Sequence, residues 1–169
     1  MKISLYNRVY NIANKYNITQ VTVHEIINSY INYCKERTLK GNVVQIYGLV
    51  TLIPDTVLSS YKTTLAYDCK ILADKIGLPS NTVYHIIKEY LESIKTELQE
   101  GNNVEMRGLV SFHIAQKPSG ENVVHSAIST TFRTDVFKYV VKYNTPVNSV
   151  RVHTHKMLKD NMKEGMING

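Results

Sequence analysis

The sequence predicts an α+β fold in which two similar units follow one another, each with a short helix, a long helix and antiparallel strands. The first observation is a self-match: the run from Ile12 to Ile53 aligns without a gap with residues 60 positions later. The second is that the identities fall on helix, turn and strand alike: Ala13/Ala73, Lys15/Lys75, Val23/Val83, Ile26-Ile27/Ile86-Ile87, Tyr30/Tyr90, Lys35/Lys95, Gly41-Asn42/Gly101-Asn102 and Gly48-Leu49-Val50/Gly108-Leu109-Val110. The match indicates an internal duplication.

The first helix is predicted over Ser4–Tyr16, where apolar residues recur at helical spacing. Asn17 breaks this pattern, as Gly77 does in the second copy. Either Thr19 or Thr22 can cap the next helix, and Thr22 has a glutamate three residues later, the spacing of a capping box. The second copy offers Pro79, Ser80 and Asn81 at the same place.

A long amphipathic helix follows in each copy, and each ends at a Gly-Asn pair. The apolar stripes are Val23, Ile26, Ile27, Tyr30, Ile31 and Cys34 in the first copy and Val83, Ile86, Ile87, Tyr90, Leu91, Ile94 and Leu98 in the second. Tyr30 and Tyr90 lie within these stripes, so we expect them in the core. Strands are then predicted over Val43–Ile53 and Val104–Ala115.

Beyond these strands the two copies diverge. The first leads to the helix Thr63–Ile76 that opens the second copy. The second continues through a turn at Lys117–Gly120 to a strand over Asn122–Phe132 and a helix over Thr134–Tyr143. The predicted organisation is therefore a first repeat (1–61), a second repeat (62–144) and a C-terminal extension (145–169), the last with a short strand and a short helix.

The unit resembles the bacterial histone-like HU and integration host factor proteins (the HU/IHF family). The resemblance is carried by the helix–turn–long helix order and by Gly108–Phe112 and Gly48–Leu52, which stand where the family has a Gly-aromatic-Gly-[ST]-Phe run. It covers residues 3–54 and 63–143. The family forms intertwined dimers, which implies a pseudo-dimer within one chain or, alternatively, pairing between chains into rings or filaments.

The resemblance also implies DNA binding through two basic β-arms, each with a proline that wedges between base pairs. This sequence departs from that pattern, because the first copy has no arm and the second has one basic residue there, Lys117, beside Pro118. The candidate DNA-binding residues are Lys62, Lys70, Lys117, Pro118 and Arg133.

Composition leaves both a nucleic-acid partner and an ordinary surface open. Lys and Arg exceed Asp and Glu by 20 to 14, for a net charge of +6 and a pI near 9.2, without a block of consecutive cations. Cys34 and Cys69 form no CxxC pair and suit small buried side chains in a reducing interior. We expect no membrane span, since no apolar run reaches about 20 residues, and no signal peptide.

No arrangement of residues typical of catalysis, of a phosphate loop or of a cofactor site stands out, so the sequence predicts a non-enzymatic protein without cofactors or a small-molecule substrate. The pair His153-x-His155 could present two imidazoles on one strand face, but no Cys or carboxylate cluster completes a metal site. We therefore expect no metal.

Two functions remain. The loss of the arms favours a fold kept for assembly, and the resemblance to HU/IHF-like virion proteins of crAss-like phages then implies a structural component of a tailed-phage particle. Such a component would form a neck or tail ring with copies of itself and other virion proteins. That protein would assemble in the host cytoplasm and reside in the virion. Its expected interface residues are Tyr139, Tyr143, Val150, Val152, Met157 and Leu158. The alternative is an architectural protein that binds double-stranded DNA as a single-chain pseudo-dimer.

Overall fold

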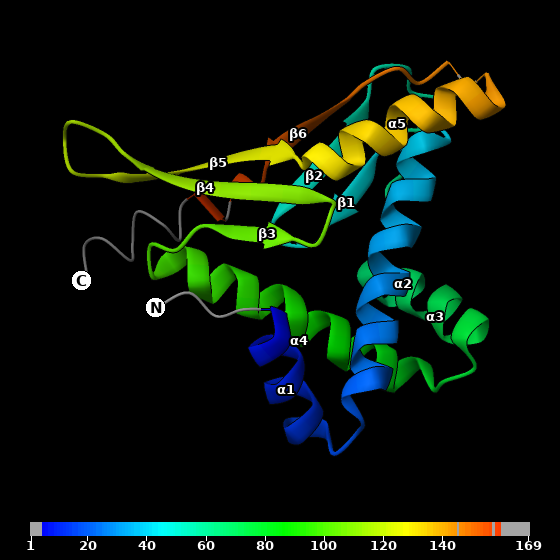
Figure 1. Cartoon of the computed structure of the whole chain (residues 1–169), viewed down its shortest axis with the longest axis vertical. Coiled ribbons are helices and arrows are strands. Elements are labelled where there is room, and N and C mark those ends of the chain that lie inside the picture. The colour runs from blue at the N-terminus through cyan, green and yellow to red at the C-terminus, as the bar shows by residue number, and fades with distance from the viewer. Residues whose placement is uncertain (1–4, 145, 157, 160–169) are drawn as a thin grey trace.

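The computed structural model describes residues 5–144, 146–156 and 158–159, which form five helices and six strands (Figure 1). In order they are α1 (Leu5–Tyr16), α2 (Gln20–Leu39), β1 (Val44–Ile46), β2 (Val50–Pro54), α3 (Leu65–Ile76), α4 (Ser80–Gln99), β3 (Val104–Met106), β4 (Val110–Gln116), β5 (Asn122–Ile128), α5 (Thr130–Tyr143) and β6 (Val150–Thr154). The α+β class is confirmed. The first three elements, α1 to β1, recur 60 residues later as α3 to β3 with the same lengths, and β2 and β4 begin 60 residues apart.

The helix ends follow the local sequence. Asn17 adopts a left-handed conformation (φ 53°) after α1, and Gly77 does so after α3 (φ 81°). Of the two threonines that could cap α2, the cap is Thr19, whose side chain accepts a hydrogen bond from the Thr22 backbone N–H at 3.2 Å. Pro79 precedes α4 and provides no side-chain cap.

Two predicted strands are in fact hairpins. The segment predicted as one strand over Val43–Ile53 turns at Gly48, which has a φ of +76°, and so divides into β1 and β2. Gly108, with a φ of +72°, divides the equivalent segment into β3 and β4. A glycine can adopt the left-handed conformation that reverses the chain here, which other residues rarely adopt. Because apolar residues alternate on both sides of each glycine, the sequence pattern resembles one continuous strand.

The C-terminal segment supplies the third strand of the first sheet. The sheet orders are β1-β2-β6 and β3-β4-β5, all antiparallel. Val50 on β2 stands opposite Thr154 on β6, as Val110 on β4 stands opposite Ile128 on β5. The residue after each third strand donates to an equivalent carbonyl: His155 N–H to Leu49 at 2.8 Å and Ser129 N–H to Leu109 at 3.0 Å. Within the segment expected to be an added extension, residues 150–155 are thus structurally equivalent to β5 and the N-cap of α5.

Helix α5 begins four residues earlier than predicted. Ser129 is its N-cap and accepts from the Phe132 backbone N–H at 3.2 Å. Phe132 is then fully buried. Strand β5 consequently ends at Ile128 rather than at Phe132. The run STTF has the β-branched residues of a strand, which explains the error.

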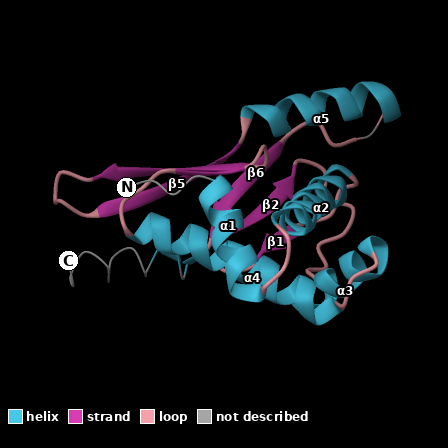
Figure 2. Cartoon of the chain, turned by 60° about the horizontal axis from the view of Figure 1, so that its bottom comes forward, coloured by secondary structure: helices cyan, strands magenta, loops and turns pink. Residues whose placement is uncertain are grey.

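Both halves share one hydrophobic core. The long helices α2 and α4 contact each other within the chain, and residues of both belong to one buried cluster that includes Tyr30 and Tyr90, as predicted. Cys34 and Cys69 are buried free thiols in it. Figure 2 shows α3 and α4 on one side of the strands and α5 on the other in that view. Among the described residues, no helix has the length and apolar character required to span a membrane.

Candidate nucleic-acid interface

One hairpin projects from the body of the molecule. Strands β4 and β5 pair over their full length, from Val110↔Ile128 near the body to Gln116↔Asn122 at the outer end (Figure 1). A tight turn closes the hairpin, with the Gly120 N–H donating to the Lys117 carbonyl at 2.8 Å. Gly120 has a φ of +88°, which the turn requires. The described residues therefore contain one short β-arm.

The tip of this arm presents Lys117 and Pro118, which are both exposed. The Lys117 ammonium lies 3.8 Å from the Glu121 carboxylate across the turn. An exposed pair of this kind is weak and is screened by salt, so the lysine stays available to an anion of higher charge density. The arm thus offers one cation and one rigid apolar ring to a ligand.

Outward-facing side chains of the second sheet follow the alternation of its strands. His113 on β4 and His125 on β5 stand directly opposite each other and are exposed, whereas their neighbours Phe112 and Val124 point into the core. The outward face between the arm and the body therefore carries two imidazoles.

The outward face of the first sheet carries a positively charged side chain, that of Arg151. On β6, Arg151 and His153 are exposed while Val150 and Thr154 are buried. The Thr154 hydroxyl donates to the Ser126 hydroxyl on β5 at 2.9 Å, so the two sheets lie side by side. The exposed side chains of β4, β5 and β6 thus stand on strands of two adjoining sheets, which run from the armless half to the arm.

The cations predicted from sequence do not all meet on this face. Arg133 is exposed in the first turn of α5, at the body end of β5. Lys70 is exposed on α3, which lies at the opposite side of the molecule from the arm tip (Figure 1). Lys62 borders a cleft of about 370 Å³ next to the start of α3. The structure therefore groups Lys117 with Pro118 and leaves Lys62 and Lys70 apart.

The sequence interpretation did not include Arg151, His113 or His125 among the interface residues, and it considered His153 only as a metal ligand. A usable signal was the alternation Val150-Arg-Val-His-Thr154, which is that of a half-buried strand with Arg and His on the exposed face. What no local pattern shows is the partner strand, because β6 pairs with β2 across about 100 residues of chain.

Three of the expected assembly residues serve the chain's own packing instead. Val150 and Leu158 are buried in the core and Val152 packs against it, because β6 completes the first sheet. Tyr139 and Tyr143 remain accessible on α5, with ring centroids 4.6 Å apart, beside a cleft of about 270 Å³ that they share with α2. Met157 lies outside the described residues.

Metal and thiol chemistry find no support in the described part of the chain. It holds no group of three or more His, Cys, Asp or Glu side chains placed to bind a metal ion. Burial raises the pKa of the Cys34 and Cys69 thiols to about 12 each, so both are protonated at neutral pH. The exposed Arg151 and imidazoles make the outward face of the sheets the candidate site.

A comparison with known proteins gives a match that includes the arm but not the first sheet. Residues 69–125 match the family of bacterial DNA-binding proteins, the HU/IHF family. This region is HU/IHF-like. The match runs from α3 through α4 and the β3–β4 turn to the arm tip and into β5. No curated protein matches the chain.

Proposed function

We propose that this protein is an architectural DNA-binding protein in which one chain performs the part of an HU/IHF dimer. The observation that supports this most strongly is the family match, because it extends to the tip of the projecting hairpin. Both halves share a core, so one chain has the two-fold body that such a protein needs. In this proposal DNA lies along the outward face of the two sheets.

The arm would act in the minor groove. Pro118 at the tip has the rigid apolar ring that can wedge between base pairs, and Lys117 is placed to contact the phosphates on either side. Each phosphate contact releases condensed counterions, so binding would weaken as salt rises. The exposed histidines His113 and His125 would face the same duplex along the arm.

Only one side of the DNA would meet an arm. Where the second half has the arm between β4 and β5, the first half has the whole of residues 55–149 between β2 and β6. On this armless side, exposed Arg151, Lys156 and Lys159 follow one another along β6 and the segment after it. These cations would hold the backbone without inserting a side chain, so the DNA would bend toward one side.

The phage-assembly function that the sequence favours receives no independent support. The family match favours DNA binding, and three of the six expected interface residues are used inside the chain. We therefore place DNA binding first and retain self-assembly as an outcome of the test.

The decisive experiment is a fluorescence-anisotropy titration of a labelled ~30 bp duplex at rising salt, with the mass of the protein recorded in parallel. We expect sub-micromolar binding by a monomer and a steep salt dependence. A double substitution, Lys117→Ala with Pro118→Ala, should reduce DNA bending more than affinity. Absence of binding, or formation of large rings by a protein that ignores DNA, would overturn the proposal.

A matched control separates the interface from net charge. Arg151→Ala with Lys156→Ala removes two cations from the armless side, and Lys40→Ala with Lys75→Ala removes two exposed cations that belong to helix ends. The first pair should lower the salt slope by about 1 for each phosphate that is no longer neutralised, and the second should leave the slope unchanged. Equal effects would mean that binding follows net charge alone.

A further inference from the structure

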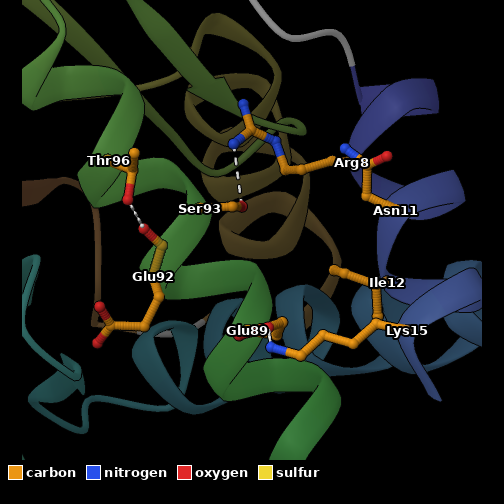
Figure 3. A pocket seen from close by; sticks show the side chains of 8 residues that line it. All are labelled: Arg8, Asn11, Ile12, Lys15, Glu89, Glu92, Ser93 and Thr96. Carbon is orange, nitrogen blue, oxygen red and sulfur yellow. Dashed lines mark hydrogen bonds and ion pairs between the residues drawn. The ribbon is translucent and has the colours of Figure 1, made fainter.

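A buried ion pair joins the first half to the second through α1 and α4. The Arg8 guanidinium contacts the Glu97 carboxylate, and the two side chains are only 6% and 0% exposed. Arg8 also donates to the Ser93 hydroxyl at 3.0 Å, as Figure 3 shows at the wall of a cleft of about 320 Å³. A buried charge without its partner is costly, so this contact is sensitive to what stands opposite Arg8.

A second ion pair joins the halves through α2 and α3. The Arg37 guanidinium lies 3.7 Å from the Asp68 carboxylate, with the two side chains 18% and 5% exposed. Asp68 also accepts hydrogen bonds from the hydroxyls of Tyr33 at 2.7 Å and Thr63 at 2.6 Å. Asp68 thus accepts from two hydroxyl groups and lies beside a cation from the other half, whose guanidinium also donates to the Thr63 hydroxyl at 2.9 Å.

The two ion pairs occupy equivalent positions with their charges exchanged. Sixty residues separate Arg8 from Asp68, and sixty separate Arg37 from Glu97. The polar neighbour of each pair is equivalent too, since Ser93 in one corresponds to Tyr33 in the other. At both positions the first half carries a cation and the second half carries an anion.

We infer that this exchange of charge restricts each half to pairing with an unlike half. If two first halves paired, Arg8 would meet Arg37 of the other copy; if two second halves paired, Asp68 would meet Glu97. Both pairings bury like charges. The unlike pairing alone places a cation against an anion at both sites.

The charges distinguish the two halves more sharply than the apolar contacts do, because much of the apolar surface of the long helices is the same in both halves. The long helices present identical side chains at four equivalent core positions, Val23/Val83, Ile26/Ile86, Ile27/Ile87 and Tyr30/Tyr90, and differ at Ile31/Leu91, Cys34/Ile94 and Thr38/Leu98. An apolar surface shared by both halves would accept either partner. The ion pairs therefore favour pairing of unlike halves, as in the closed chain, over rings or filaments built by pairing of like halves.

The test reverses one pair in the full chain and measures the mass by light scattering after refolding. Arg8→Glu alone should lower the Tm by about 10 °C, because it buries two carboxylates together. Arg8→Glu with Glu97→Arg should restore much of that loss. It also gives each half one cation and one anion, so like halves become compatible. We expect this double variant to form dimers and larger species when refolded at up to about 1 mM, near the effective concentration of linked halves, while the native chain stays a monomer.

A quadruple variant is the matched control. Adding Arg37→Asp and Asp68→Arg to the double variant reverses both pairs, so that each half is again uniform in sign, and the monomer should return. If Arg8→Glu with Glu97→Arg does not fold, Arg37→Glu with Asp68→Arg reverses the less buried pair and makes the same prediction.

Three outcomes would overturn the inference: a folded single-pair reversal that stays as monomeric as the native chain, a native chain that itself forms like-paired dimers, or failure of both reversals to fold. The last would show that the contacts depend on the particular side chains rather than on their sign. None of these readouts involves DNA, so the result is independent of the proposed function.

Discussion

The two halves reach the same three-stranded sheet by different routes. In the second half, β3, β4 and β5 follow one another, and the β4–β5 connection is the arm. In the first half, β2 pairs with β6, and the entire second half lies between these two strands in the sequence. The comparison shows that an exposed hairpin end is a place where a whole folding unit can be accommodated, because the strands on either side stay in register.

The largest expected effect comes from ending the chain at Asn148. This removes β6 and the buried Leu158, leaving β2 as an unpaired edge, and should lower the free energy of unfolding by more than about 5 kcal/mol. Replacing the exposed arm tip, 117–121, with a two-residue turn should change it by less than about 1 kcal/mol. Urea denaturation compares the two. Equal losses would show that β6 contributes no more to the stability of the fold than the arm tip does.

Leu158→Ala and Phe132→Ala test the same equivalence at single positions. Both side chains are fully buried, and each lies four residues after the end of the third strand of its sheet, which is Thr154 for Leu158 and Ile128 for Phe132. We expect losses of about 3 and about 4 kcal/mol in the free energy of unfolding, from reduced apolar burial and the cavities left behind. Val141→Ala, at an exposed position on α5, should change it by less than about 0.5 kcal/mol. A Leu158 variant as stable as the Val141 variant would place this segment outside the core.

Alanine substitutions at the two turn glycines, Gly48 and Gly108, should lower the Tm by amounts that differ less than those above. Both have positive φ, so alanine at either is strained by about 1 kcal/mol. A Cβ at Gly108 would also approach Lys35 and Thr131 at 3.4 Å, whereas at Gly48 the nearest atom is the Lys95 ammonium at 3.8 Å. Gly108→Ala should therefore lower the Tm more than Gly48→Ala. Thermal denaturation measures both losses. Equal losses would show that Lys35 and Thr131 accommodate the added methyl group at no cost in stability.

Each half contributes one buried thiol, and these two thiols should lower the free energy of unfolding only at alkaline pH. Burial raises the pKa of Cys34 and Cys69 from 9.0 to about 12. The unfolded chain loses these protons first, so the free energy of unfolding should be unaffected below about pH 9 and decline above it, by up to about 1.4 kcal/mol per pH unit for each thiol. Urea titrations at pH 8, 9 and 10 check this. Cys34→Ala with Cys69→Ala should flatten the decline, and an unchanged slope would assign it to other groups.

Local patterns predicted most of the helices and the residues of the core. The apolar stripes of α2 and α4, the glycine and asparagine stops and the burial of Tyr30 and Tyr90 follow from spacing alone. The turn at Gly48 was not predicted, because a glycine between apolar residues also fits a continuous strand. The place of β6 was not predicted either, since the pairing of Val50 with Thr154 leaves no trace in either local sequence. For the same reason the outward face with Arg151 could not be assembled from the sequence.

The position of β6 also sets an order of events during synthesis. The second half has all its strands once residues up to Ile128 have emerged, whereas the sheet of the first half lacks its third strand until Thr154 is available. The partners β2 and β6 are distant in sequence, so their pairing is the slowest kind of contact to form. The half that leaves the ribosome first is the half that is finished last.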